Sequence, residues 1–178
     1  MNAYREGLSG ACPRCNGALT ATDRGGVGLD ECGGCGGVFL AEKAVERVLS
    51  DDAVRANLAA ELAPRPRYVE QGVRYLKCPR CTRAMNRKVF ARVSGVIVDV
   101  CKDDGVFFDG GELGAVVAFV DRGGLAKQAA LEARERQERA KEARRPSGPP
   151  TISNPYVGSD SGLEASSDLV GLLAELFR

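Results

Sequence analysis

The sequence predicts a small α+β protein that depends on bound metal for its stability, with two β-hairpin units that are each followed by a helix. Seven cysteines occur in 178 residues without any histidine, and six of them form three C-x-x-C pairs. Aromatic residues make up only 6% of the chain. We therefore expect no large apolar core, and small domains of this kind often need a metal or disulfides.

An internal repeat predicts the two hairpin units. Each copy begins with the tetrapeptide CPRC and continues with residues that suit a hairpin, whose far end holds a second pair of candidate ligands. The aligned segments are 12–15 with 78–81, 26–32 with 95–101 and, after one deletion, 36–40 with 105–109. The charged helices and the C-terminal segment lie outside this repeat.

The first copy contains four candidate metal ligands, which are Cys12, Cys15, Cys32 and Cys35. Two C-x-x-C pairs at this separation are typical of a zinc site. Four thiolates complete a tetrahedral site and leave no open position for a substrate, which indicates a structural metal. A redox dithiol, buried cysteines and a rubredoxin-like iron site are the alternatives.

The second copy contains Cys78, Cys81 and Cys101, followed by Asp104 where the first copy has a cysteine. A carboxylate is a competent zinc ligand, with a Zn–O distance of about 2.0–2.2 Å. We therefore expect a zinc site made of three thiolates and one carboxylate. One alternative is a vacated site in which Asp103 and Asp104 only cap the turn. Another is a three-ligand site with a bound water, which would resemble a catalytic zinc.

Both copies resemble the TFIIB-type zinc ribbon, whose pattern is C-P-x-C, a hairpin, and then C-x-x-C-x-G-V-W-x-D-x-G-E-L. The matching stretches are 32-CGGCGGVFL-40 and 101-CKDDGVFFDGGEL-113, with phenylalanine in place of tryptophan. The resemblance covers about residues 10–45 and 76–115, and it implies two tandem ribbons that bind zinc rather than iron. Second ribbons of such proteins often have histidine at the position of Asp104. The resemblance is specific for metal but not for a role, because ribbons bind nucleic acids, bind proteins or serve as scaffolds.

Apolar spacing and breaker residues divide the chain into six predicted segments. They are a first ribbon with its helix (10–62), a linker (63–76), a second ribbon with its helix (77–121), a charged helix (122–145), a disordered linker rich in Pro, Gly and Ser (146–165) and an amphipathic helix (166–178). Asp109 is expected to be the N-cap of a helix that begins near Glu112, rather than a catalytic acid.

The amphipathic C-terminal segment is predicted to dock on a partner protein. Its apolar residues fall on one helix face, and they are Leu169, Leu172, Leu173, Leu176 and Phe177. A 13-residue helix is marginal alone in water, so we expect it to enter a groove. Packing onto the ribbons is the alternative. A membrane surface is disfavoured because Arg178 is the helix's only cation.

Residues 65–92 contain nine basic residues and one acidic residue, with Tyr68 and Tyr75 among them. Such a segment suits phosphate binding combined with base stacking. The candidate nucleic-acid contacts are Arg80, Arg83, Arg87 and Lys88. The alternative is a solvated surface that the acidic stretch 99–112 partly neutralises.

Taken together, these features predict a non-enzymatic zinc-binding protein that acts as a protein–protein adaptor or regulatory scaffold. The alternative is a nucleic-acid-binding regulator of transcription that uses residues 65–92. The net charge of +1 favours neither partner. A zinc-dependent or thiol-redox enzyme is disfavoured because the sequence lacks histidine, a P-loop, a G-x-S-x-G motif and a dinucleotide motif.

The same sequence indicates a cytoplasmic protein that binds neither a membrane nor a small-molecule substrate. The first ten residues contain no apolar signal-peptide core. No apolar run approaches the roughly 20 residues that span a bilayer. In a reducing compartment, C-x-x-C pairs bind metals or exchange electrons rather than form structural disulfides.

Overall fold

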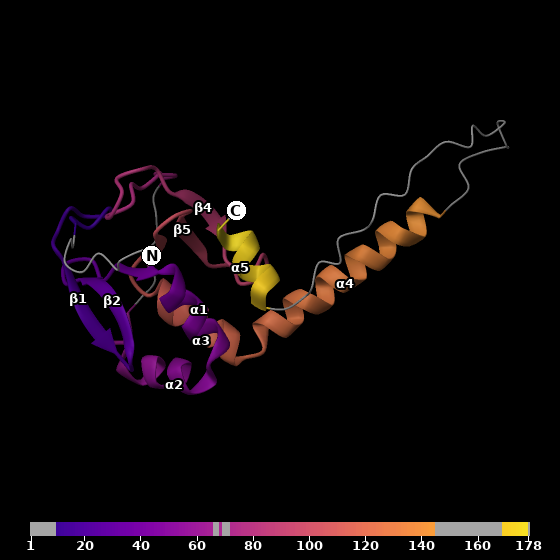
Figure 1. The fold of residues 1–178 in the computed structure, drawn as a ribbon, viewed down its shortest axis with the longest axis horizontal. Coiled ribbons are helices and arrows are strands. Elements are labelled where there is room, and N and C mark those ends of the chain that lie inside the picture. Colours follow the sequence, from indigo (N-terminus) through magenta and orange to yellow (C-terminus); the bar gives the residue numbers. More distant parts are fainter. Residues whose placement is uncertain (1–9, 66–67, 69–71, 145–168, 178) are drawn as a thin grey trace, which may run out of the picture.

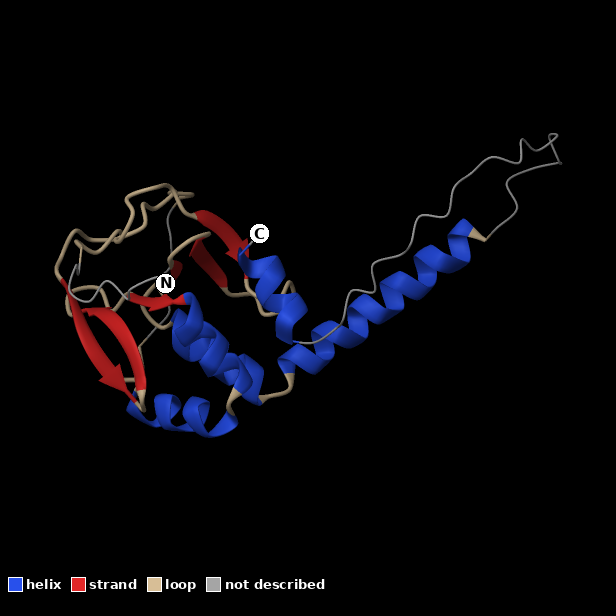
Figure 2. Ribbon diagram, viewed as in Figure 1, coloured by secondary structure: helices blue, strands red, loops and turns tan. Residues whose placement is uncertain are grey.

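The computed structural model describes residues 10–65, 68, 72–144 and 169–177. Within these described residues, six strands form one antiparallel sheet that is accompanied by five helices (Figures 1 and 2). This architecture confirms the α+β class. The elements are β1 (Leu19–Arg24), β2 (Val27–Cys32), β3 (Val38–Ala41), α1 (Glu42–Ser50), α2 (Asp52–Glu61), β4 (Asn86–Val89), β5 (Ile97–Cys101), β6 (Gly105–Phe108), α3 (Glu112–Asp121), α4 (Gly124–Ala143) and α5 (Leu169–Phe177).

The sheet has the strand order β1-β2-β3-β6-β5-β4, so its two halves are arranged symmetrically about the β3–β6 junction. The first sequence copy supplies β1–β3 and the second supplies β4–β6. At the junction Phe39 pairs with Phe107, and Leu40 pairs with Val106. The two copies are therefore joined edge to edge through their third strands, which the sequence analysis did not predict.

The β1–β2 hairpin has a two-residue turn because Arg24 pairs directly with Val27. The turn residues Gly25 and Gly26 have φ angles of 60° and 82°. A type I′ turn requires two residues in this left-handed region, and glycine adopts it without steric cost. The turn lies against α2, since a Cβ atom on Gly25 would be 2.4 Å from the backbone nitrogen of Leu58.

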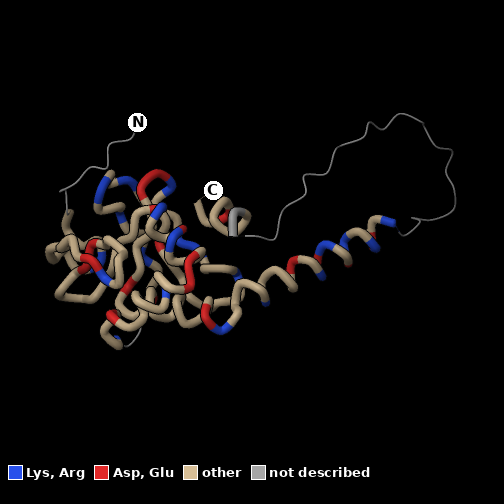
Figure 3. Tube along the Cα trace, turned by 60° about the horizontal axis from the view of Figure 1, so that its bottom comes forward, with Lys and Arg blue, Asp and Glu red and all other residues tan. Residues whose placement is uncertain are grey.

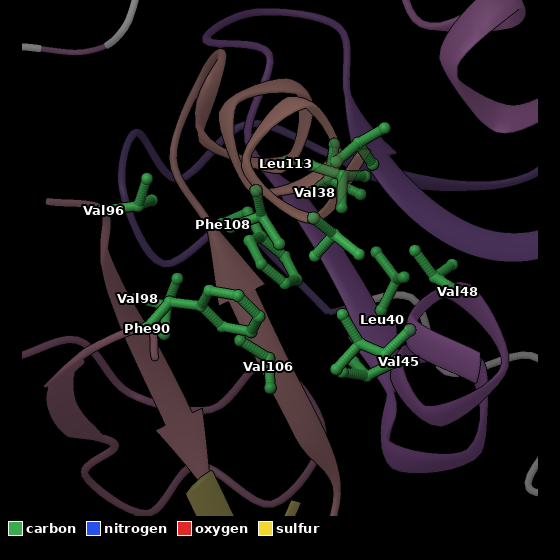
Figure 4. Close-up of a cluster of buried hydrophobic side chains, with 14 of the residues drawn as sticks. Val38, Leu40, Val45, Val48, Phe90, Val96, Val98, Val106, Phe108 and Leu113 are labelled. Carbon is green, nitrogen blue, oxygen red and sulfur yellow. The ribbon is translucent and has the colours of Figure 1, made fainter. Parts of the chain in front are cut away.

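One face of the sheet packs against the helices and forms the main apolar core (Figure 4). Alternate side chains of a strand point to one face, and both halves contribute to this core. From the strands it contains Val27, Leu29, Val38, Leu40, Val98, Val100, Val106 and Phe108; from α1 and α3 it contains Val45, Val48, Leu49, Leu113, Val116, Val117 and Val120. The two copies thus share one core, and the expectation of no large apolar core is wrong.

The opposite face of the sheet packs against the cysteine-bearing loops. Its buried cluster contains Phe39 and Phe107 together with Leu19, Leu76, Met85 and four of the cysteines. Both phenylalanine rings are fully buried. The candidate ligand sets therefore lie on the side of the sheet that the helices do not cover.

Helix α4 extends away from the body of the protein (Figure 1). Only Gly124 and Gln128 are buried along its 20 residues. Lysine, arginine and glutamate alternate along its far part (Figure 3). Such a helix is stabilised by helix propensity and i,i+4 charge pairs rather than by an apolar face.

Helix α5 packs on the protein's own core in this structure. Leu176 is only 4% exposed, and Leu172, Leu173 and Phe177 are partly buried against the same cluster. The Lys88 side chain donates hydrogen bonds to the carbonyl oxygens of Glu175 and Leu176, at 2.9 and 3.0 Å. The apolar face of α5 thus packs on the protein itself, as the alternative to docking predicts. Docking of this helix on a partner stays a prediction.

Two further expectations concern other parts of the chain. The predicted disordered linker, residues 146–165, lies outside the described residues. Within the described part of the chain, no helix combines the length and the apolar character needed to cross a membrane.

Candidate metal centres

The first ligand set is brought together by two tight loops. The N–H of Cys12 donates to the Gly17 carbonyl at 2.7 Å, and the N–H of Cys32 donates to the Gly37 carbonyl at 2.8 Å. Asn16 has a φ of 61° and Gly36 a φ of 72°, so each loop turns back sharply after its second cysteine. All four Sγ atoms therefore converge.

The sulfur geometry of the first set fits a tetrahedral metal ion. The Sγ atoms of Cys12 and Cys35 are 3.5 Å apart, as are those of Cys15 and Cys32. All four sulfur atoms lie within 4.8 Å of one another. Two sulfurs at the zinc–thiolate distance of about 2.3 Å, at tetrahedral angles, are about 3.8 Å apart. The donor set is thus nearly in the geometry that zinc requires.

The ionisation of these thiols is unequal. Burial raises the pKa of Cys12 and of Cys35. Burial also opposes ionisation of Cys32, but hydrogen bonds from the Cys35 and Gly34 backbone and from Cys15 lower its pKa to about 7. One thiolate therefore forms readily near neutral pH, and a cation must offset the charge of the others. Metal binding with proton release meets this requirement.

The second ligand set contains Cys78, Cys81, Cys101 and Asp104, as the sequence predicts. The Sγ atoms of Cys81 and Cys101 are 3.5 Å apart. Asp104 Oδ2 lies 3.3 Å from the Sγ atoms of Cys78 and Cys101. The same four groups lie within 4.8 Å of one another, so the aspartate occupies the fourth corner of the cluster.

Asp103, the neighbouring acid, is not part of this cluster. Its carboxylate forms an exposed ion pair with Arg83. Burial and Asp104 oppose ionisation of Cys81, but contact with Arg83 lowers the pKa of that thiol. Partial burial likewise opposes ionisation of Asp104, but hydrogen bonds from the thiols keep the pKa of its carboxyl low. Asp104 is therefore a carboxylate at neutral pH, as a ligand must be.

The loop that bears Asp104 differs from its counterpart by one residue. Cys101 pairs directly with Gly105 in the β5–β6 register, whereas the first copy has Gly36 and Gly37 between Cys35 and β3. The carboxylate oxygen lies one bond further from its Cα than a cysteine sulfur does. The longer side chain thus accompanies the shorter loop.

The expectation that Asp109 is a helix N-cap is wrong. Helix α3 has Gly111 at its N-cap position, with no side-chain cap. The Asp109 carboxylate instead accepts two hydrogen bonds from Arg14, one from Nε at 2.7 Å. Both side chains are buried, at 8% and 5% exposed, so the carboxylate is used to neutralise a buried guanidinium.

Glu112 takes part in the same charged group. Its carboxylate accepts a hydrogen bond from the Asp109 N–H at 2.9 Å. Burial, together with the nearby charges of Asp109 and Asp99, raises the pKa of Glu112 to about 7 despite that hydrogen bond. Arg14 also stacks on the ring of Tyr68, 4.8 Å from its centroid.

Arg80 is the arginine of the second CPRC loop, and it makes the equivalent contacts with residues of the first half. Its guanidinium is 3.1 Å from the Asp30 carboxylate and 4.9 Å from the centroid of the Phe39 ring. Arg80 was predicted to contact nucleic acid, whereas Arg14, Asp30 and Asp99 were not among the predicted site residues. The available signal was that the repeat places arginine and aspartate at matching positions in both copies.

The remaining predicted site residues have different contacts. Arg83 pairs with Asp103, and Arg87 and Lys88 both lie on β4, where the Lys88 amine donates to carbonyl oxygens near the C-terminal end of α5. The predicted docking side chains Leu172, Leu173, Leu176 and Phe177 contact the core. Leu169 begins α5.

A cavity of about 650 Å³ lies beside the first ligand set, between α2, α3 and the loop that follows α2. Its charged lining residues are Glu31, Arg65, Asp109 and Asp121, and its apolar ones include Leu62 and Val117. Gly36 lets Arg65 approach, since a Cβ there would lie 2.4 Å from an Arg65 nitrogen. None of the eight candidate ligands lines this cavity.

One comparison with known proteins matches the first unit. No curated protein and no solved structure matches the chain. Residues 11–51 match the family model described as transcription factor zinc-finger, a TFIIB-type zinc ribbon, and the four-cysteine cluster lies within the matched segment.

Proposed function

We propose that this protein holds two structural zinc ions, one in each half of the sheet, and acts as a protein–protein adaptor rather than as an enzyme. The observation that supports it most is that each ligand set offers four protein donors within 4.8 Å of one another. Four protein ligands fill a tetrahedral zinc and leave no open position for a substrate.

The proposal treats the second half as a second zinc ribbon with an altered ligand. It has the three-stranded arrangement of the first half and a CPRC loop with the same hydrogen bonds. The N–H of Cys78 donates to the Arg83 carbonyl at 2.8 Å, as that of Cys12 does to Gly17. Thr82 has a φ of 63°, close to that of Asn16. Asp104 then takes the role of the fourth cysteine.

In this proposal the cavity near Arg65 is not an active site. Catalytic zinc sites combine an open metal position with a pocket that holds the substrate. The cavity contains no candidate metal ligand, and the three acids that line it each form an ion pair. Asp109 binds Arg14, Asp121 pairs with Arg55 at 2.7 Å, and Glu31 pairs with Arg24 at 2.9 Å and with Arg65 at 3.6 Å.

The exposure of helix α4 supports the proposal of a protein partner. It presents 20 residues with almost no burial, and Leu131 is 37% exposed on it. A long helix that projects from a compact body offers a surface that another helix can pack against. The far part has both charge signs, so a partner with a complementary charge pattern would be selected.

A nucleic-acid partner is the second candidate, favoured by the basic composition of residues 65–92. Intramolecular ion pairs of these basic residues weaken the case for a nucleic-acid partner. Arg80 pairs with Asp30, Arg83 with Asp103 and Arg92 with Glu135, while Arg65 lies near Glu31. A basic residue already paired with a carboxylate has less charge to offer a phosphate, so we prefer the protein partner.

Site-specific crosslinking separates the two candidates. A photo-crosslinking residue at position 131 on α4 should give a discrete protein adduct in cells, unchanged by nuclease treatment. The same residue at Ala56, which is exposed on α2, is the matched control and should not. Nuclease-sensitive adducts, together with salt-dependent binding of the purified protein to DNA or RNA at low salt, would favour the alternative and overturn the adaptor.

A further inference from the structure

Arg14 and Arg80 form reciprocal contacts between the two halves of the sheet. Arg14 stands between Cys12 and Cys15 in the first CPRC loop. Its guanidinium binds Asp109 and lies 4.0 Å from the Asp99 carboxylate, both in the second half. Arg80 stands at the matching position of the second loop, and its guanidinium reaches Asp30 in the first half at 3.1 Å.

Two of the three aspartates that these arginines contact precede a metal ligand of the half opposite to the arginine. Asp30 is two residues before Cys32 on β2, and Asp99 is two residues before Cys101 on β5. Each arginine therefore connects the loop of one ligand set to the strand that positions the other set. Arg80 also packs on the ring of Phe39 at the centre of the sheet.

These ion pairs are shielded enough from water for the position of a loop in one half to affect the strand that it contacts in the other half. The side chains of Arg14 and Asp99 are each 5% exposed, and Arg80 and Asp30 are at most 28% exposed. A buried ion pair is costly to break by moving one partner, because the other charge remains buried without compensation. A loop that is ordered by its metal thus holds its arginine in place, and that arginine holds the strand of the other half.

We infer that the two metal sites load as a coupled pair, in which filling either ligand set raises the zinc affinity of the other through Arg14 and Arg80. The inference rests on the proposed function, since both sets must bind metal. An ion at one site supplies part of the ordering that the second site would otherwise have to provide. Linkage makes the effect equal in both directions, and site–site coupling usually lies at about 5- to 150-fold.

Cobalt(II) titration of metal-free full-length protein measures this coupling. The thiolate-to-cobalt absorption of a site with four thiolates differs from that of a site with three thiolates and a carboxylate, so the two occupancies are followed separately. The coupling factor is the affinity of the second set in the wild type divided by its affinity in a C15A/C35A variant, in which the first set is disabled. Wild-type protein should give a factor of about 5 or more.

Substitutions in the Arg80–Asp30 pair should weaken the coupling without removing the sites. The factor should fall toward 1 when the same ratio is measured in an Arg80→Gln background and in an Asp30→Asn background. Both should still bind two ions. The matched control is Arg24→Gln, which breaks an ion pair with Glu31 that lies within the first half and should leave the factor unchanged.

The reverse measurement keeps the test valid if the C15A/C35A variant does not fold. The affinity of the first set is then measured with and without Cys81→Ala and Asp104→Ala, and linkage requires the same factor. A wild-type factor near 1, or a large factor that Arg80→Gln and Asp30→Asn leave unchanged, overturns the inference. Binding of a single ion by the wild type would instead refute the two-site function on which the inference rests.

Discussion

Phe39 pairs with Phe107 at the centre of the sheet, where β3 meets β6. The two residues hold equivalent positions in the sequence repeat, within Gly-Val-Phe in both copies. The flanking pairs, Val38 with Phe108 and Leu40 with Val106, follow the same two-fold relation. The repeat is therefore also a spatial one, and both candidate metal clusters adjoin one apolar layer.

Glycines at the junction let the two halves approach closely, and Gly37→Ala should destabilise the protein. A Cβ at position 37 would lie 2.5 Å from the Phe107 ring. Overpacking of this kind costs about 1–3 kcal/mol. Urea unfolding of the zinc-loaded protein measures the cost. Gly33→Ala is the matched control because no atom lies within 4 Å of its Cβ position, and equal stability of both variants would contradict the close junction.

Asp109→Ala should destabilise the protein strongly, because it removes the carboxylate that accepts two hydrogen bonds from the buried Arg14 guanidinium. Breaking a buried ion pair from one side costs about 3–5 kcal/mol. Glu135→Ala breaks the exposed pair with Arg92 and should cost no more than about 1 kcal/mol. Chemical denaturation compares the two variants. A loss for Asp109→Ala no greater than that for the control would show that the buried pair has no structural role.

Glu112→Gln should stabilise the protein above neutral pH. The folded-state pKa of about 7 exceeds the unfolded value of about 4.3, so the folded state binds the proton more tightly. Wild-type stability therefore falls as pH rises between these values, and the neutral amide avoids the fall. The stability difference between variant and wild type should grow from about pH 4.5 to about 7 and then level off, at about 3–4 kcal/mol. A difference that does not change with pH would refute this assignment.

Removal of α5 should lower the melting temperature. Deleting residues 169–178 exposes the apolar surface that Leu176 and its neighbours cover. A fully buried leucine contributes about 1.5–3 kcal/mol, which corresponds to a shift of about 5–10 °C in a chain of this length. Leu176→Ala should show part of the shift, and Glu175→Ala, whose side chain is exposed, should show none. An unchanged melting temperature would instead favour docking of this helix on a partner.

The sequence predicts the ligand sets because metal-ligand spacing is a local property. Eight residues selected by C-x-x-C spacing and by the repeat come together in the structure. Asp104 could be included because it occupies the position of a cysteine in an otherwise matching copy. Apolar spacing also predicts helices close to where α1 and α5 lie, and the charged, helix-favouring composition predicts a helix close to α4.

The junction between the halves could not be predicted in this way. A short apolar run such as Val38–Leu40 fits any buried strand and does not specify which edge it pairs with. Asp109 stands before a helix, where a cap and an ion-pair partner look alike in sequence. The apolar face of α5 would be the same for a partner groove as for the protein's own core. Each of these outcomes depends on contacts between residues far apart in the chain.

The measurement that tests the central claim most directly is the number of zinc ions per chain, determined by elemental analysis of purified wild type and Asp104→Ala. The account predicts two ions in the wild type, because each ligand set is complete with four side chains. It predicts a value near one in the variant, which retains only three thiolates in the second set. Asp103→Ala is the matched control, since its carboxylate binds Arg83 outside the cluster, and should keep two ions. One ion in the wild type, or two in Asp104→Ala, would contradict the claim that the aspartate completes a second zinc site.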